Sequence, residues 1–150
     1  MKSVMLSIRP KWCEKIVSGE NTTEVRKTKP KLETPFKCYI YCTNSGVATG
    51  MWGKHGKVVG EFTCNTVTNL FSNSRFWLNE DDVLQTCLSA AEIRKYADGA
   101  NGLYGWHISD LVYYDKPKEL SEFKGLRKTK FGYEPVEIKR PPQSWCYVEE

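Results

Sequence analysis

The pattern of apolar and polar residues near the start of the chain predicts a strand, a short helix and a second strand. Residues 2–8 are apolar with short polar residues between them, which is typical of a β-strand. Pro10 suits the first turn of a helix, and Gly19 stands where a left-handed residue would end it. The apolar stripe of this helix consists of Trp12, Ile16 and Val17. The alternating, β-branched stretch 22–28 then predicts the next strand.

The remainder of the chain mixes strand patterns with two short helices. Further strands are expected at 36–42, 57–68, 103–114 and 141–148. One helix is expected to begin near residue 79 and another at the Ser89–Glu92 capping box. Loops are expected at 29–35, 43–56 and 124–140. Gly60, inside a strand, indicates a bulge. This succession predicts an α+β fold.

Length and composition limit the class of protein. A chain of 150 residues, 40% of them hydrophobic and 27% charged, predicts one globular domain covering 1–150 and excludes a disordered or fibrous chain. No apolar run approaches the roughly 18 residues of a membrane span, and no signal sequence is apparent, so we expect a cytoplasmic protein. Six cysteines without a Cys-x2-Cys pair, and two histidines, favour reduced core thiols over disulfides. We expect no metal and no cofactor.

The net charge of +4 is unevenly distributed. Residues 1–60 carry 11 Lys and Arg against 4 Glu, whereas residues 61–115 carry 3 against 8 Asp and Glu. Residues 116–150 are again basic, with 8 against 6. Basic ends around an acidic middle favour one positive face that attracts a phosphate backbone. The alternative is a set of solvated lysines that only keep the protein in solution.

The strongest candidate site lies in the predicted strand after Gly19. Glu24 and Arg26 are two residues apart and therefore share one face of that strand. An acid and a base on one face, directly after a helix end, form a compact polar cluster. The cluster is expected to include Arg9, Asn21, Glu24 and Arg26, with Lys15 and Lys27 nearby.

The spacing of Gly19, Glu24 and Arg26 resembles the Gly-x-Lys-x-x-Glu-x-Arg motif of the ASCH domain, a PUA-like family linked to RNA. The segments 7–12, 104–110 and 141–145 look like a phage and Firmicute branch of that family, so the resemblance covers nearly the whole chain. It implies a small mixed PUA-like β-barrel of about five or six strands with flanking short helices. The chain departs from the motif at Asn21, where the family has lysine.

The resemblance also implies possible enzymatic activities. One bacterial ASCH branch is an amidohydrolase that deacetylates N4-acetylcytidine with a lysine, a threonine and a glutamate. The lysine position is Asn21 here and the threonine position is Glu24, and asparagine cannot act as a base because its amide does not titrate usefully. Other members are reported to cleave RNA, which would make Glu24 or His107 the candidate acid or base.

Aromatic and polar residues elsewhere complete the predicted site. Guanidinium forks suit phosphates and base edges, and a carboxylate suits an exocyclic amine. The 103–114 strand would present a stacking platform, or else its aromatics belong to the core. Candidate stacking residues are Trp52, Tyr104 and Trp106, beside His107. Gln143 and Ser144 are candidates for pairing with base edges. Candidate phosphate contacts are Lys27, Lys29 and the lysines of 124–130.

The leading hypothesis is an RNA- or nucleotide-binding module with Glu24 and Arg26 on the floor of a basic cleft. The first alternative is a hydrolase acting on a modified nucleoside or an RNA strand, with Glu24 as the catalytic residue. The second is a phage-encoded protein-interaction adaptor without a nucleic-acid partner. No membrane partner is expected, and the two acidic helices are expected to be scaffold away from any nucleic acid.

Overall fold

The structure is a computed structural model that describes residues 2–45, 53–72, 75–76 and 80–150. Its strands are β1 (Lys2–Ile8), β2 (Thr23–Arg26), β3 (Phe36–Cys42), β4 (Lys57–Asn69), β5 (Phe71–Ser72), β6 (Arg75–Phe76), β7 (Tyr104–Lys118), β8 (Lys124–Thr129), β9 (Gly132–Glu137) and β10 (Trp145–Glu149). Its helices are α1 (Pro10–Val17), α2 (Glu80–Thr86), α3 (Ala90–Ala97) and a 3-10 turn at Leu120–Glu122. These elements confirm the predicted α+β class.

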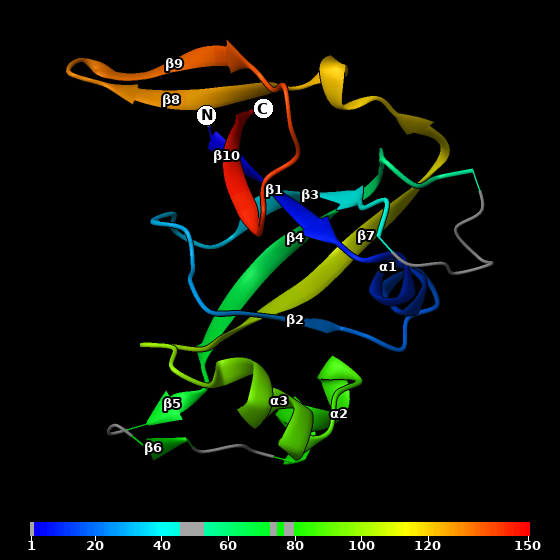
Figure 1. The fold of residues 1–150 in the computed structure, drawn as a ribbon, viewed down its shortest axis with the longest axis vertical. Coiled ribbons are helices and arrows are strands. Elements are labelled where there is room, and N and C mark those ends of the chain that lie inside the picture. The colour runs from blue at the N-terminus through cyan, green and yellow to red at the C-terminus, as the bar shows by residue number, and fades with distance from the viewer. Residues whose placement is uncertain (1, 46–52, 73–74, 77–79) are drawn as a thin grey trace.

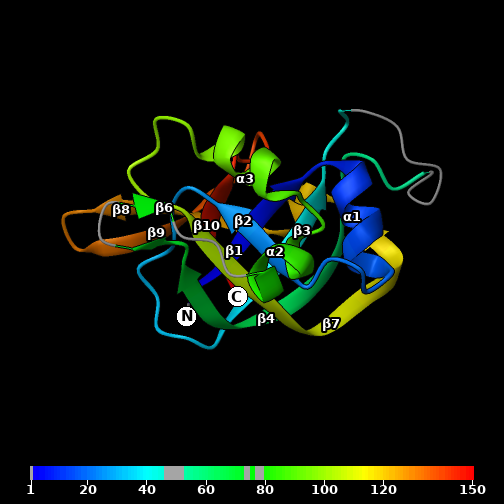
Figure 2. The same ribbon diagram turned by 90° about the horizontal axis from the view of Figure 1, so that it is seen from below.

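Eight strands form one mixed sheet in the order β2-β7-β4-β3-β1-β10-β8-β9. β1 runs parallel to β3 and antiparallel to β10, so the first and last strands of the chain lie side by side in the sheet. Figure 1 shows α2 and α3 at one end of the molecule and the β8–β9 hairpin at the other. In Figure 2, α1 lies on the side away from the hairpin. The helices therefore cover the sheet at separate places.

The sheet is not closed into the expected barrel within the described residues. Its edges are β2 and β9, each paired with one neighbour. Closure would need a hydrogen-bonded ladder between those two edges. β9 contains Pro135, whose nitrogen cannot donate, and it belongs to a hairpin that projects from the body of the molecule (Figure 1). The sheet is therefore open.

Both faces of β1 are buried, which fixes this strand at the centre of the fold. Val4, Leu6 and Ile8 belong to the main core cluster, whereas Met5 packs with Tyr39 in a second one. α1 packs on the main cluster through one side, and its buried residues are Pro10, Cys13 and Ile16. Three buried residues at helical spacing hold α1 beside the end of β1. Because α1 is held against the core, the chain that follows Gly19 and leads into β2 has a defined position relative to β1.

The cysteines belong mainly to this core. All six are free thiols, and four of them are buried. Burial raises the pKa of Cys64 and of Cys146 to about 11, so both thiols stay protonated and unreactive near neutral pH. The described residues contain no group of three or more His, Cys, Asp or Glu placed to hold a metal ion. No described helix is long and apolar enough to cross a membrane.

α3 packs against β2 and is not remote scaffold. Ser89 and Glu92 form the capping box expected at its start, each side chain bonding to the other's backbone nitrogen. Ile93 and Ala97 are buried in a cluster that includes Val25 of β2. This packing brings the next turn of α3 alongside the polar face of β2. Thr86 of α2 and Tyr96 of α3 both line the cleft described below, so the expectation that the two acidic helices are scaffold away from the site is wrong for both.

Residues 124–140, expected to be a loop, contain the β8–β9 hairpin instead. β8 pairs with β9 from Lys124 opposite Glu137 to Thr129 opposite Gly132, whose φ of 120° permits the turn. Arg127 and Glu134 form an ion pair across the two strands. Most of the hairpin is polar on both faces, so its strands lack the alternation that sequence patterns detect. β8 is joined to the sheet through Val148 of β10 opposite Gly125.

Gly60 lies at a bulge, as its position in a strand pattern predicted. The register of β4 against β7 shifts between Val58 and Gly60. A Cβ at Gly60 would lie 2.6 Å from the backbone oxygen of Val112. We expect Gly60→Ala to lower the free energy of unfolding by about 1–3 kcal/mol, because backbone must move to admit the methyl group. Urea denaturation would measure this loss.

The matched control is Asn65→Ala in the same strand, where the side chain is exposed. It should change stability by less than about 0.5 kcal/mol. Equal stability of the two variants would mean that the β4–β7 contact at Gly60 is not tight.

Candidate functional site

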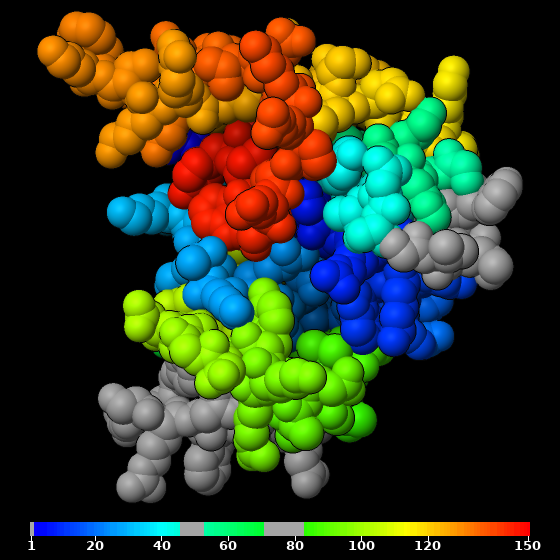
Figure 3. Space-filling view, in the orientation of Figure 1, coloured from blue at the N-terminus to red at the C-terminus, as the bar shows by residue number. Residues whose placement is uncertain are grey.

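A cleft of about 940 Å³ opens between β2, the start of α1, α3 and the segment before β10. Figure 3 shows the face on which these blue, green and orange-red segments meet. The predicted site residues that line it are Arg9, Asn21, Glu24, Arg26, Lys27, Gln143 and Ser144. These residues come from sequence positions as far apart as 9 and 144, and the fold brings them to one cavity. The prediction that Glu24 and Arg26 share one face of a strand therefore identified two residues that line the same cleft.

Arg26 ties three segments together at the cleft floor. Its Nη2 donates to the backbone oxygen of Ser7 at 2.9 Å and to Oε2 of Glu24 at 3.3 Å. Its Nη1 donates to the backbone oxygen and to Oγ of Ser144, at 3.2 and 3.1 Å. The side chain is only 11% exposed. With four partners, Arg26 holds the end of β1, β2 and the 141–144 segment in place, so its role is to position the cleft walls.

Glu24 is the acid of the cleft floor. Its side chain is 13% exposed, and its Oε1 accepts from the backbone nitrogen of Val25 at 3.3 Å. The ion pair with Arg26 fixes the other oxygen. A carboxylate oxygen can accept more than one hydrogen bond, so both oxygens keep capacity for a ligand donor. Glu24 is thus oriented by the protein and still able to accept.

Three cations line the cleft without an acidic partner. The ion pairs among the described residues do not include Arg9, Lys27 or Lys95. Arg9 precedes α1 and is exposed, and Lys95 is an exposed residue of α3. Unpaired guanidinium and ammonium groups around a concave surface create a field that attracts anions. The cleft is therefore basic at its rim.

Asn21 occupies a buried position at the cleft, where the ASCH motif has lysine. Its Oδ1 accepts from the backbone nitrogen of Thr23 at 3.1 Å, and its own backbone nitrogen donates to the oxygen of Lys15. No described residue accepts from the side-chain nitrogen of Asn21, which leaves two donor hydrogens. Asn21 therefore offers a donor in the cleft that also contains the Glu24 acceptor.

Two aromatic side chains of the cleft were missed in the sequence. Trp12 of α1 and Tyr96 of α3 both line it, and Tyr96 is 40% exposed. Burial is the main cause that raises the pKa of Tyr96, with a smaller lowering by the charge of Arg26 and a smaller raising by that of Glu24. Lys27 Nζ lies 4.9 Å from the centre of the same ring. The only sequence signal was an aromatic within each amphipathic helix, which indicates core equally well.

Several predicted site residues lie elsewhere. Lys15 pairs with Glu20 at 2.9 Å outside the cleft, and Trp52 falls outside the described residues. Trp106 is directly opposite Glu24 in the β2–β7 register, yet it is 0% exposed because Phe36 and Trp145 pack against its ring. Of the two alternatives for Trp106, platform or core, the structure therefore places it in the core.

Tyr104 also packs on that core. Its ring is half-buried against the main cluster, with Lys29 Nζ 5.4 Å from its centre, and it does not line the cleft. Neither Tyr104 nor Trp106 therefore presents a free ring face inside the cleft.

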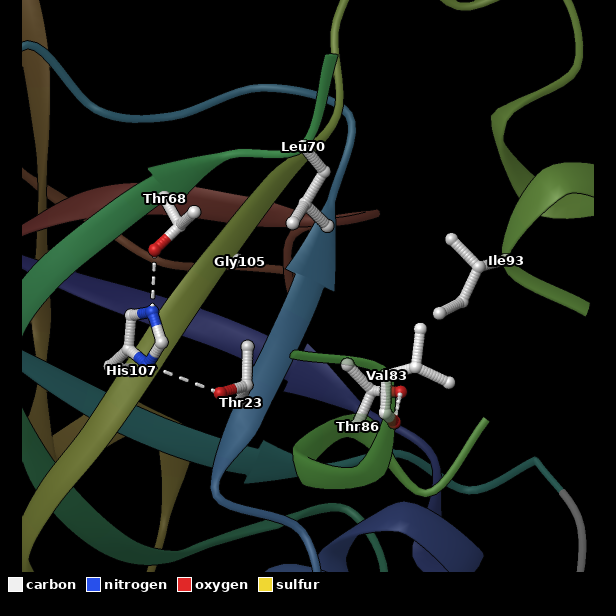
Figure 4. Close-up of a pocket in the computed structure, with 8 residues that line it drawn as sticks. All are labelled: Thr23, Thr68, Leu70, Val83, Thr86, Ile93, Gly105 and His107. Atoms are coloured by element: carbon white, nitrogen blue, oxygen red, sulfur yellow. Dashed lines mark hydrogen bonds between the residues drawn. The ribbon is translucent and has the colours of Figure 1, made fainter. Parts of the chain in front are cut away.

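His107 does not line the cleft and lies instead at a separate, small pocket, between Thr23 and Thr68 (Figure 4). Its Nε2 shares a hydrogen with Thr68 Oγ1 at 2.6 Å, and its Nδ1 is 3.2 Å from Thr23 Oγ1. Apolar side chains of α2 and α3, with Leu70, close the space around it, which admits no water molecule. With both ring nitrogens hydrogen-bonded to threonines, His107 is a partly buried structural residue between β2, β4 and β7.

Comparison with solved structures identifies proteins that have a similar fold. The sequence matches no protein-family profile and no curated protein. The ASCH structure from Zymomonas mobilis matches with a TM-score of 0.60 and 19% identity over 99% of this chain and 88% of that chain. A variant of the same protein matches with a TM-score of 0.61 and 19% identity, over 100% and 92% of the two chains. The similarity therefore extends along the whole chain.

Proposed function

We propose that this chain, which has the fold of an ASCH domain, is a member of that family and binds single-stranded RNA or a nucleotide in the cleft floored by Glu24 and Arg26. The observation that carries the proposal is an oriented, mostly buried carboxylate in a cavity that is also lined by the Asn21 amide, two aromatic side chains and three cations without an ion-pair partner among the described residues. Each of these groups matches one part of a nucleotide.

The proposed recognition divides among the cleft residues. Glu24 accepts from an exocyclic amine, and the side-chain nitrogen of Asn21 donates to a neighbouring acceptor of the same base edge. Tyr96 or Trp12 stacks on the base, since aromatic rings accept any base on their faces. Arg9 and Lys95 contact phosphate. Arg26 stays with its four protein partners and orients Glu24.

The geometry supports binding better than the hydrolase alternative. The residue at the motif lysine position, Asn21, is held by the backbone of Thr23 and cannot serve as a base. His107, the other candidate for acid–base work, is sealed away from the cleft between two threonines. Two carboxylates line the cleft, and that of Glu92 caps α3 by accepting from the backbone nitrogen of Ser89, which leaves Glu24 as the candidate acid or base. No described hydroxyl or thiol of the cleft is hydrogen-bonded to Glu24.

Tryptophan fluorescence titrated with a short single-stranded RNA tests the proposal. We expect saturable quenching, because Trp12 lines the cleft, and a Trp12→Phe variant should lose most of that signal. With about three phosphate contacts, affinity should fall roughly 20-fold between ~50 and ~200 mM salt.

Two outcomes would count against the cleft. No quenching at low salt would exclude RNA as the ligand and leave a free modified nucleoside or a protein partner. Quenching that survives unchanged in Trp12→Phe would place the ligand on another surface.

A further inference from the structure

Three aromatic rings form a row on the surface next to the cleft. Trp145 and Tyr147 lie on one face of β10, with ring centres 5.2 Å apart, and Tyr133 of β9 lies 6.0 Å beyond Tyr147. Trp145 and Tyr147 are half-buried, because they also pack on the main core, and Tyr133 is 41% exposed. We call these three residues the aromatic row.

A lysine side chain accompanies the row. Lys2 Nζ lies 3.5 Å from the centre of the Tyr133 ring and 5.0 Å from that of Tyr147. Glu149 is opposite Lys2 in the β1–β10 register, but no ion pair joins them in the described chain. The backbone nitrogen of Lys31 donates to the Tyr147 hydroxyl at 2.8 Å, so this hydroxyl is held by the main chain of the 29–35 segment. Aromatic faces with cations next to them are the groups that bind successive bases and phosphates of a single strand.

The row continues directly from the cleft. Ser144 of the cleft wall precedes Trp145, and Lys27 of the opposite wall precedes Thr28. Trp145 Nε1 donates to Thr28 Oγ1 at 2.8 Å, so the two walls meet at the first ring of the row. In Figure 3 the red surface of β10 is open between the light-blue segment after β2 and the orange segment after β9. The row therefore begins at the edge of the cleft, where its two walls meet.

We propose that the aromatic row binds the nucleotides adjoining the one held in the cleft, so that the ligand is a single strand of several nucleotides and not a free nucleotide. This inference rests on the proposed function of the cleft. It assigns Tyr133, Tyr147 and Lys2 as determinants of ligand length. A protein partner would not need a nucleotide-sized cavity next to a row of rings with the Lys2 ammonium group over two of them.

Tyr133→Ala tests this inference, because its side chain is the most exposed of the row and lies on an edge strand. Affinities for an eight-nucleotide single-stranded RNA and for a nucleoside monophosphate would be measured for each variant. Tyr133→Ala should weaken octanucleotide binding roughly 5- to 100-fold, the range for loss of one stacked base. It should leave monophosphate binding unchanged, and Lys2→Gln should act in the same direction. Phe131→Ala, on the same hairpin with a side chain that is 98% exposed, is the matched control and should bind both ligands normally.

The possible results distinguish the proposed role of the aromatic row from the proposed function of the cleft. The row is excluded if the octanucleotide binds no more tightly than the monophosphate to the parent protein, or if Tyr133→Ala weakens both ligands equally. It is also excluded if Tyr133→Ala binds the octanucleotide normally while Glu24→Gln weakens it. If Glu24→Gln binds both ligands normally, the proposed function of the cleft itself is wrong. Thermal unfolding of Tyr133→Ala, expected to match the parent, confirms that the comparison concerns folded protein.

Discussion

An Arg26→Ala variant is expected to lose about 3–5 kcal/mol of stability, because removing one partner of a nearly buried ion pair leaves the other charge uncompensated. The guanidinium bonds to Glu24, to the end of β1 through Ser7 and to the 141–144 segment through Ser144. Alanine would release all three at once. Urea denaturation, compared with the parent protein, measures the loss.

Two further variants isolate the cause. Arg26→Lys keeps the charge but not the planar fork that reaches three segments, so its stability should fall between those of the parent and Arg26→Ala. Lys27→Ala removes the neighbouring exposed cation and should change stability by less than about 0.5 kcal/mol. An Arg26→Ala protein as stable as Lys27→Ala would show that the 141–144 segment is held by other contacts.

A Glu24→Gln variant is expected to bind short RNA roughly 10- to 100-fold more weakly, which corresponds to one hydrogen bond to a charged group. Glutamine keeps the size of the side chain but replaces an acceptor with a donor, and that amide would face both Arg26 and the amine of the base. Fluorescence titration at low salt measures the change. Folding should be disturbed less than in Arg26→Ala, because the guanidinium keeps its bonds to Ser7 and Ser144.

The control for this variant is Glu20→Gln. Glu20 is an exposed acid that precedes Asn21 and pairs with Lys15 outside the cleft. Its replacement should leave RNA affinity unchanged. If Glu24→Gln bound RNA normally but stopped an RNA-cleaving or deacetylating turnover of the parent protein, the hydrolase alternative would replace the binding module.

The segment around the motif could be predicted because its determinants are local. A proline start, a glycine end and a β-branched run are read from neighbouring residues, and they located α1 and β2. The same strand periodicity placed Glu24 and Arg26 on one face. The capping box at Ser89 was predicted for the same reason. Signals within about four residues therefore sufficed for the elements and for the cleft floor.

The cleft walls could not be predicted, because they depend on contacts between distant elements. Tyr96 faces the cleft only because Ile93 and Ala97 pack α3 against Val25. Trp106 is on the same face as Glu24, but the covering rings of Phe36 and Trp145 come from other strands. Sequence periodicity predicts which face of a strand a residue occupies, but it does not predict which side chains from other elements cover that face.

Two predictions, a closed barrel and a loop at 124–140, were wrong for related reasons. Strand patterns do not show whether two sheet edges meet, and here β9 turns away with Pro135 at the edge. The hairpin carries its charges on both faces, so it has the composition of a loop and becomes a strand pair through its register. In both cases the deciding interaction is a backbone ladder, to which side-chain patterns contribute little.

The adjacency of β1 and β10 has a kinetic consequence. Ser7 Oγ donates to the backbone oxygen of Pro142 at 2.6 Å, a contact between residues 135 positions apart, and Arg26 bonds across 118 positions to Ser144. Contacts of such sequence separation form late, since loop closure must precede them. A chain that has folded β1, α1 and β2 but not yet docked β10 therefore has the acid and base of the motif without a cleft around them. The proposed ligand binding would thus be a property of the completed sheet, and it would appear in refolding only with the last strand.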